Sequence, residues 1–148
     1  MPYYITDVVG KLVKIDEKIE SIYNDISNYS KKLKVTSRVL AKDKQRQVSV
    51  YTGFENKIKV DEKDFLDYLV YDKVSSLISQ LDAEMQLSYP ANTKDLLVYA
   101  LDIESRELAL QLDVKGRLLS LNTTQNEVMD FLIGEEKKHI VSINNFLI

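Results

Sequence analysis

The sequence predicts an all-α fold, a four-helix bundle in which two antiparallel helical hairpins are joined by a long, partly helical crossover. Helix-breaking residues are scarce, since the 148 residues include only four glycines and two prolines. Apolar residues recur every three or four positions along four long segments, which is the spacing of an amphipathic helix. Because 45% of the residues are hydrophobic, residues 1–148 should form a single domain with its own core.

The first hairpin is expected from residues 5–29 and 31–57. In each segment the apolar positions fall on one face of a helix, and the alternating stretch QVSVYTGF (47–54) fits this pattern as well as it fits a strand. The loop between the two segments is short, so the helices should be antiparallel neighbours. The apolar positions are Ile5, Val8, Leu12, Ile15, Ile19, Ile22 and Ile26, followed by Leu33, Leu40, Val48, Tyr51 and Phe54.

The second hairpin is expected to begin at Thr93, whose hydroxyl is a suitable N-cap for a helix over 93–114. Thr124 is followed three residues later by Glu127, which is the capping-box pattern and predicts the start of the fourth helix. The connection between these helices is again short, so they should also pack antiparallel.

The crossover between the hairpins spans residues 58–92. Its apolar spacing predicts helix in two pieces, 62–71 and 72–86, and Pro90 ends it. The crossover is rich in apolar side chains and is the surface through which we expect a homodimer to form. Its apolar residues are Phe65, Leu66, Leu69, Val70, Tyr71, Leu77, Ile78 and Leu81.

A weak internal repeat supports the arrangement in two hairpins. Residues 42–54 align with 134–146, and both segments end in Phe. Residues 12–22 align with 100–110 in the same apolar register. Matching registers of this kind are expected from duplicated helical hairpins.

Composition excludes several classes of function. The chain has no cysteine, so it forms no disulfide, thiolate metal site or cysteine nucleophile. Its net charge of −3 comes from interspersed acids and bases, which argues against binding to nucleic acid or to a membrane surface. The N-terminal sequence has no signal-peptide pattern and no apolar run reaches spanning length, so we expect a cytoplasmic protein.

Three ionisable residues fall inside the apolar stripes of the second hairpin. Glu136 lies in the middle of one stripe, His139 lies one turn further on against Leu132 and Phe146, and Glu104 lies in the stripe of the preceding helix. Burying a carboxylate costs several kcal/mol unless a cation compensates it. One Glu from one helix and Glu-x-x-His from its neighbour is the ligand pattern of a carboxylate metal site in a helix bundle. The apolar neighbours are Met129, Leu132, Ile133, Ile140, Ile143 and Leu147 for Glu136, and Leu97, Ala100, Leu101 and Leu108 for Glu104.

The segments ALDIESREL (100–108) and EEKKHI (135–140), together with the hairpin–crossover–hairpin order, resemble the ferritin-like superfamily and in particular rubrerythrin-type domains. In that family each hairpin supplies one Glu and one Glu-x-x-His, and the ligands hold two irons for peroxide, oxygen or ferroxidase chemistry. The resemblance implies that Glu104, Glu136 and His139 form one half of such a metal site.

The first hairpin departs from the family pattern. The repeat places Asp16, a shorter carboxylate, where the other Glu belongs, so Asp16 is a weaker candidate ligand. Lys44 occupies the position equivalent to Glu136, and Gln47 the position equivalent to His139. A protonated lysine binds no metal and glutamine is a poor iron ligand. We therefore expect Lys44, with Gln47 beside it, to be an internal counter-charge for the buried carboxylates in place of metal.

Two classes of function follow. The first is a non-enzymatic, homodimeric bundle whose diiron site is half lost and whose role is structural or in interactions. The alternative is an oxidoreductase or metal-handling protein that binds one iron, manganese or zinc ion through Glu104, Glu136 and His139. Because the four cysteines of a rubredoxin-like tail are absent, its redox cycle would need an external electron donor. Tyr23 and Tyr51 point inward, either as core residues or as redox-active groups beside such an ion.

Overall fold

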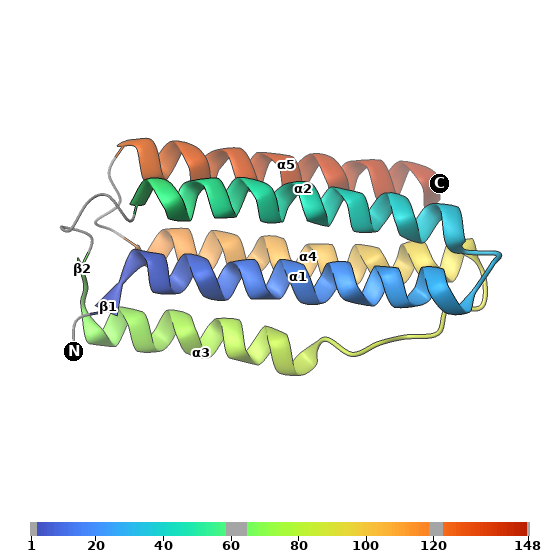
Figure 1. Ribbon diagram of the computed structural model, residues 1–148, viewed down its shortest axis with the longest axis horizontal. Coiled ribbons are helices and arrows are strands. Elements are labelled where there is room, and N and C mark those ends of the chain that lie inside the picture. Colours follow the sequence, from blue (N-terminus) through green and yellow to red (C-terminus); the bar gives the residue numbers. More distant parts are fainter. Residues whose placement is uncertain (1–2, 59–64, 119–122, 148) are drawn as a thin grey trace.

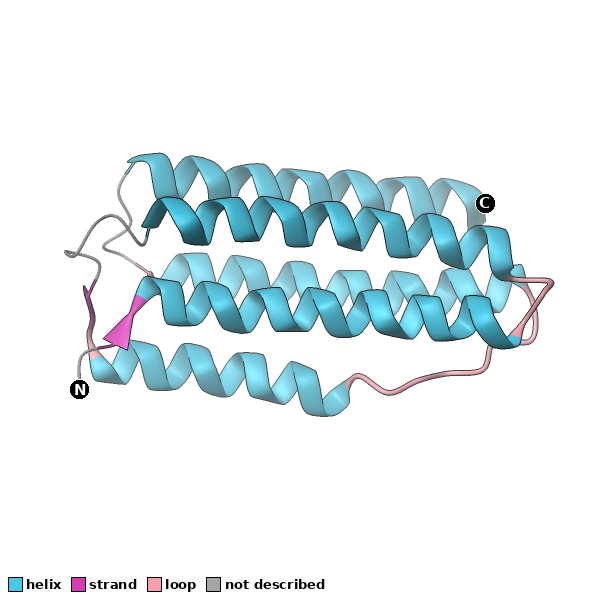
Figure 2. Ribbon diagram, in the orientation of Figure 1, coloured by secondary structure: helices cyan, strands magenta, loops and turns pink. Residues whose placement is uncertain are grey.

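The computed structural model describes residues 3–58, 65–118 and 123–147 of the chain. Within these ranges the protein is helical except for one short pair of strands and the loops (Figures 1 and 2). This confirms the all-α class that the sequence predicts. The side chains of residues 55–58, 65, 123 and 124 lie outside the description.

Four long helices and one shorter helix make up this part of the chain. The first two helices pack against each other, and so do the last two (Figure 1). The two helices of each pair run antiparallel, as expected from the short connections in the sequence. The helices are α1 (Ile5–Tyr29), α2 (Lys34–Ile58), α3 (Tyr68–Glu84), α4 (Thr93–Arg117) and α5 (Thr123–Leu147), and the strands are β1 (Tyr3–Tyr4) and β2 (Phe65–Leu66).

The helix boundaries differ from the sequence-based expectation by a few residues. α1 has the predicted bounds, whereas α2 begins at Lys34 rather than at residue 31. The N-cap of α4 is Asn92 and not Thr93, because Asn92 Oδ1 accepts a hydrogen bond from the backbone N–H of Asp95 at 2.8 Å. The capping box expected at Thr124 involves a side chain outside the described residues.

The crossover contains one continuous helix instead of two pieces. α3 runs through residues 71 and 72 without a break, and the part of the first piece before residue 65 lies outside the described residues. The chain reaches α3 through β2, which pairs antiparallel with β1 in the register Tyr3–Leu66 and Tyr4–Phe65. This pairing fixes the start of α3 beside the start of α1.

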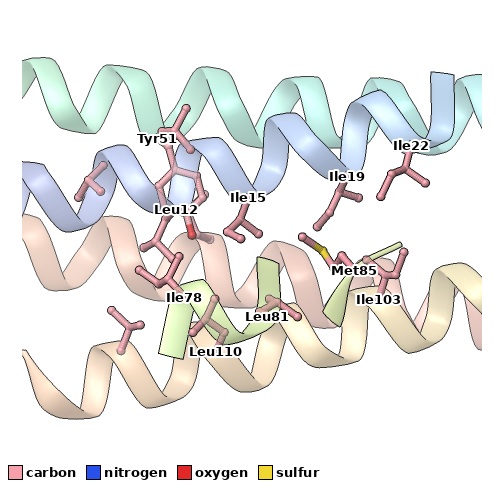
Figure 3. Close-up of a cluster of buried hydrophobic side chains, with 14 of the residues drawn as sticks. Leu12, Ile15, Ile19, Ile22, Tyr51, Ile78, Leu81, Met85, Ile103 and Leu110 are labelled. Atoms are coloured by element: carbon pink, nitrogen blue, oxygen red, sulfur yellow. The ribbon is translucent and has the colours of Figure 1, made fainter. Parts of the chain in front are cut away.

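α3 covers the seam between α1 and α4, and it packs against both helices (Figure 1). Its residues Val74, Ile78 and Leu81 are buried, and Figure 3 shows Ile78 and Leu81 facing the interior side chains Leu12 and Leu110. Most of the crossover surface that the sequence suggested for a dimer therefore packs onto the bundle itself. Of the apolar residues that the sequence suggested, Leu69 is 74% exposed, and the crossover also exposes Tyr68 at 56% and Tyr89 at 70%.

The core is a single apolar cluster that runs the length of the bundle, and all five helices of the described chain contribute side chains to it. None of these helices has a stretch that is apolar enough, over a sufficient length, to cross a lipid bilayer. At its middle the core is interrupted by charged side chains.

Candidate functional site

Charged and amide side chains gather at the middle of the bundle, inside the apolar core. They come from the four 25-residue helices. The lysine, carboxyl and glutamine side chains are at most 4% exposed, so each charge must be balanced by a neighbour and not by water. We call this group the lysine–carboxylate cluster, and it consists of Asp16 on α1, Lys44 and Gln47 on α2, Glu104 and Glu107 on α4, and Glu136 and His139 on α5.

The spacing of the apolar residues explains why these polar side chains face inward. On α2 the buried positions Leu40, Lys44, Gln47 and Tyr51 follow one another at intervals of four, three and four residues, which places them on one helix face. Because Leu40 and Tyr51 pack into the core, the two polar residues between them are carried inside. The same register holds for the polar positions of α4 and α5.

The ammonium group of Lys44 is fully hydrogen-bonded. Its Nζ donates to Gln47 Oε1 at 2.9 Å, to Glu136 Oε2 at 3.2 Å and to Glu107 Oε2. Gln47 in turn donates from Nε2 to Glu136 Oε2 at 2.8 Å. The amide of Gln47 thus accepts from the ammonium with its oxygen and donates to a carboxyl group with its nitrogen, which bridges the two charged residues.

Two further carboxyl groups complete the surroundings of Lys44. Asp16 Oδ1 lies 3.8 Å from Lys44 Nζ, and Glu104 Oε2 is in direct contact with it. Burial alone would lower the pKa of Lys44, but the surrounding carboxylates outweigh burial and hold this pKa well above its ordinary value. Lys44 is therefore a cation throughout the neutral pH range.

His139 is a second cation at the edge of the cluster. Its Nε2 lies 3.0 Å from Asp43 Oδ2, and its Nδ1 lies 3.8 Å from Glu104 Oε2. Burial would lower the pKa of His139, but the hydrogen bond with Asp43 and the charge of Glu104 raise it to about 10. The hydrogen bond with His139 also lowers the pKa of Asp43. The imidazole is consequently protonated at neutral pH.

The carboxyl groups divide into those that keep a proton and those that lose it. Burial raises the pKa of Glu107 well above its ordinary value, and burial also raises the pKa of Glu136, to about 10. Burial also raises the pKa of Asp16, to about 6. Burial would also raise the pKa of Glu104, but the positive charge of Lys44 beside it outweighs burial and lowers this pKa below its ordinary range. The negative charge of one carboxyl group raises the pKa of its neighbours, so these buried groups do not all ionise together.

Two buried tyrosines flank the cluster, as the sequence suggested. The hydroxyl of Tyr23 donates to Glu104 Oε1 at 2.8 Å, and the hydroxyl of Tyr51 accepts from Gln111 Nε2 at 3.1 Å. Burial raises the pKa of both tyrosines well above 10. Each phenol is thus neutral, hydrogen-bonded and packed in the core.

Sequence reasoning missed three residues of this region. Glu107 and Gln111 are buried on α4, and they continue the intervals of three and four residues that begin at Ala100 and Glu104. That spacing was a usable signal, because it extends the inner face through both positions. Asp43 carries no comparable signal, since it lies at the edge of the inner face of α2 and is half-buried.

Some of the expected apolar neighbours are placed differently. Leu101 and Leu108 are only half-buried, because the inner face of α4 is turned toward Glu107 and away from them. Ile140 is also half-buried. Phe146 is 80% exposed and does not pack over His139 inside the core, as the sequence had suggested.

Three residues of the cluster could hold a metal ion. Glu104, Glu136 and His139 each offer one ligand atom, and these atoms lie within 4.8 Å of one another. Each residue also has one buried polar atom without a hydrogen-bond partner, namely Glu104 Oε2, Glu136 Oε1 and His139 Nδ1. Carboxylate oxygen and imidazole nitrogen suit iron, manganese or zinc. The donor set therefore fits a single ion.

The same geometry does not fit a second ion. Lys44 and Gln47 occupy the α2 side of the cluster, and an ammonium group repels a metal cation. Even the single ion would compete for its ligands, because Lys44 contacts Glu104 and His139 carries a proton. Asp16, the weaker candidate ligand, lies beside Lys44 and is not one of the three converging ligands.

Comparison with known proteins does not assign the chain to a family. No protein-family model matches it, and neither a curated protein nor a solved structure matches it significantly.

Replacement of Glu136 by Gln tests the retained proton. In the wild type the folded chain keeps a proton on Glu136 between its ordinary pKa of 4.5 and about 10, whereas the unfolded chain releases it, so stability falls as pH rises through this window. Gln has the shape of the protonated acid and does not titrate. Glu136→Gln should match the wild type in urea unfolding near pH 4 and become more stable by about 1 kcal/mol or more near pH 9.

The control for this measurement is Glu135→Gln, which removes the neighbouring, more exposed carboxylate and its ion pair with Arg46. Its effect should stay within about 1 kcal/mol across the same pH range. A Glu136→Gln variant that is less stable than the wild type near pH 9 would show that Glu136 is an ionised partner of Lys44.

Proposed function

We propose that this protein is a ferritin-like helical bundle in which a lysine stands in place of metal, and that it acts as a non-enzymatic structural or interaction module. One observation carries the proposal: the Lys44 ammonium lies within 4.0 Å of four buried carboxyl groups. A cation at this position neutralises carboxylates that would otherwise be uncompensated.

The internal repeat supports the comparison with a metal site. It aligns Lys44 with Glu136 and Gln47 with His139, and all four residues lie in one cluster. Lys44 Nζ is 3.2 Å from Glu136 Oε2, so two positions that the repeat treats as equivalent meet across the bundle. In the proposed ancestor both positions would have carried Glu ligands. The substitution to lysine replaces one of two like charges with a cation that donates a hydrogen bond to Glu136.

The charge balance supports a metal-free state. Lys44 and His139 supply two positive charges, and Glu107 and Glu136 stay protonated at neutral pH. The carboxyl groups that do ionise lie next to these two cations. Neutrality is thus reached with protons and side-chain cations, which is the condition for keeping such a group buried.

Burial of the cluster also supports a non-enzymatic role. The side chains of Lys44, Glu104 and Glu136 have no exposed surface. A substrate would need to open the bundle to reach them, whereas a structural cluster needs no access. Buried polar groups of this kind can fix the register of packed helices, because another register leaves charges unpaired.

A second candidate function is metal binding, favoured by the convergence of Glu104, Glu136 and His139. These residues would hold one iron, manganese or zinc ion through two carboxylates and an imidazole. The ion would supply Lewis-acid chemistry and, if it were iron or manganese, redox chemistry. To bind the ion, His139 would have to release its proton and Lys44 would have to move away from Glu104.

Replacement of Lys44 by Met tests the counter-charge directly. The variant leaves the ionised carboxylates of Asp16 and Glu104 without their cation, so the free energy of unfolding should fall by about 3–5 kcal/mol at neutral pH. The loss should shrink below about pH 4.5, where the carboxyl groups take up protons in both states. Lys42→Met is the matched control, because Lys42 is exposed on the same helix. If Lys44→Met unfolds like the wild type at all pH values, the counter-charge proposal is wrong.

The double change Lys44→Glu with Gln47→His tests the proposed relation to metal sites. It supplies the two ligand types that the repeat pairs with Glu136 and His139, so thermal stability should rise when ferrous or manganous ion is added. At a metal concentration about 100 times the Kd, the gain should be about 2.7 kcal/mol. Lys44→Met, which adds no ligand, should not respond.

Two results would count against the proposal in different ways. A double variant that ignores added metal would contradict the ancestry from a metal site. A wild-type protein that is itself stabilised by ferrous or manganous ion under anaerobic conditions would favour the second candidate function.

A further inference from the structure

Two long seams of the bundle, between α1 and α4 and between α2 and α5, differ in what covers them. α3 lies along α1 and α4 and packs against both, whereas α2 and α5 form the opposite side of the molecule (Figure 2). Within the described residues no helix covers the seam between α2 and α5.

Large apolar side chains are exposed along the α2–α5 seam. At one end Val35 and Val39 on α2 are 77% and 55% exposed, and Phe146 on α5 is 80% exposed. At the other end Phe131 on α5 is 53% exposed and lies beside the half-buried Val50 of α2. The apolar residues thus form two groups, one at each end of the seam.

Each group borders a hollow between the two helices. The hollow at the first end has a volume of about 260 Å³, is walled by Val39, Leu97 and Phe146, and reaches His139 and Asp43 at its inner side. A smaller hollow of about 70 Å³ lies between Val50 and Phe131 at the other end. Apolar hollows next to exposed apolar side chains favour an occupant that brings apolar groups to both ends.

An oppositely charged pair lies between the two ends. Arg46 on α2 lies 3.0 Å from Glu135 on α5, and the side chain of Arg46 is 66% exposed. The face therefore has an apolar group at each end and a charged pair between them. The positive charge of this pair lies on α2 and the negative charge on α5. This pattern is complementary to itself.

We propose that the α2–α5 seam is the interface of a homodimer with twofold symmetry. A second copy, turned by half a rotation about an axis parallel to the helices, places α5 of one chain on α2 of the other at the same level. Arg46 then faces Glu135 of the other chain, and Val39 faces Phe146. The apolar group at the far end meets its own copy in the same way.

The size of the face fits a stable dimer. A helix of 25 residues is about 37 Å long and about 10 Å wide. Two such helices side by side present about 700 Å² per chain, so the interface would bury about 1,400 Å² in total, which lies within the range of specific interfaces. The crossover also exposes Tyr68, Leu69 and Tyr89, at 56%, 74% and 70%, but the two tyrosine rings pack against Tyr3 and Tyr29 of the same chain.

The dimer would also complete the burial of the cluster. The larger hollow reaches His139 and Asp43, and it is also lined by Val39 and Phe146. A second chain on this face would close the hollow. The two features are independent, however, and the interface does not rest on the function proposed above.

Sedimentation equilibrium over a concentration series tests the interface. The wild type should show a reversible species of twice the 17.1 kDa chain mass. Val39→Glu buries a carboxylate at the centre of the apolar group and should weaken the dimer by at least about tenfold. Val98→Glu is the matched control, because Val98 is 50% exposed on α4, away from the seam. It should leave the dimer intact.

A charge exchange tests the orientation of the two chains. Arg46→Glu alone should weaken the dimer, because the new glutamate of one chain then faces Glu135 of the other chain and the two carboxylates repel each other. Adding Glu135→Arg restores a pair of opposite charges, so the double variant should dimerise again. Circular dichroism and thermal unfolding of each variant separate loss of dimer from loss of fold.

Three results would overturn the inference. They are a folded wild type that stays monomeric at every concentration, a dimer that survives Val39→Glu, and a dimer that is lost in Leu69→Glu, which changes α3. The first result would leave the seam to an apolar ligand or to a helix of another protein, and the third would move the interface to the crossover.

Discussion

The interaction on which the rest of the structure depends is the contact between the Lys44 ammonium and the carboxyl groups that surround it. A single positive charge at the centre of an apolar bundle costs far more than folding can supply unless it is paired and hydrogen-bonded. Here the ammonium donates to Gln47, Glu107 and Glu136 and also contacts Glu104. The four long helices must therefore align at one level, because each of them supplies a partner, or Lys44 itself, to this contact. The apolar layers above and below follow from that alignment.

The cluster reaches neutrality by protonation as well as by pairing. Four buried carboxyl groups, those of Asp16, Glu104, Glu107 and Glu136, lie near two cations, and full ionisation would leave an excess of two negative charges. The raised pKa values of Glu107 and Glu136 remove that excess. A single divalent ion would balance two of these carboxylates in their ionised form, with Lys44 displaced and the other two carboxyl groups protonated. A metal site and a lysine site can thus be built on one scaffold, and the residue at position 44 decides between them in the function that we propose.

Periodicity was sufficient to predict the helical class and the inward direction of Glu104, Glu136 and Lys44, because an apolar stripe carries its polar members inside. It did not single out Glu107, since a rotation of α4 by a fraction of a turn exchanges Glu107 with Leu108 on the inner face. It also failed for α3, where pairing of β1 with β2 and burial of Ile78 hold one continuous helix that local spacing divided in two. The protonation states lay beyond the sequence, because they depend on distances between side chains from different helices.

The most direct test of the account is the charge on Lys44, measured by nitrogen-15 NMR of lysine side chains in the wild type during an alkaline titration. The Lys44→Met variant assigns the signal. The account predicts a slowly exchanging ammonium resonance that persists above pH 10.5, the ordinary pKa of lysine, until the protein unfolds. A Lys44 signal that titrates at or below 10.5, or that exchanges with water as fast as the exposed lysines, would show that the ammonium is not enclosed by carboxyl groups and would contradict the central claim.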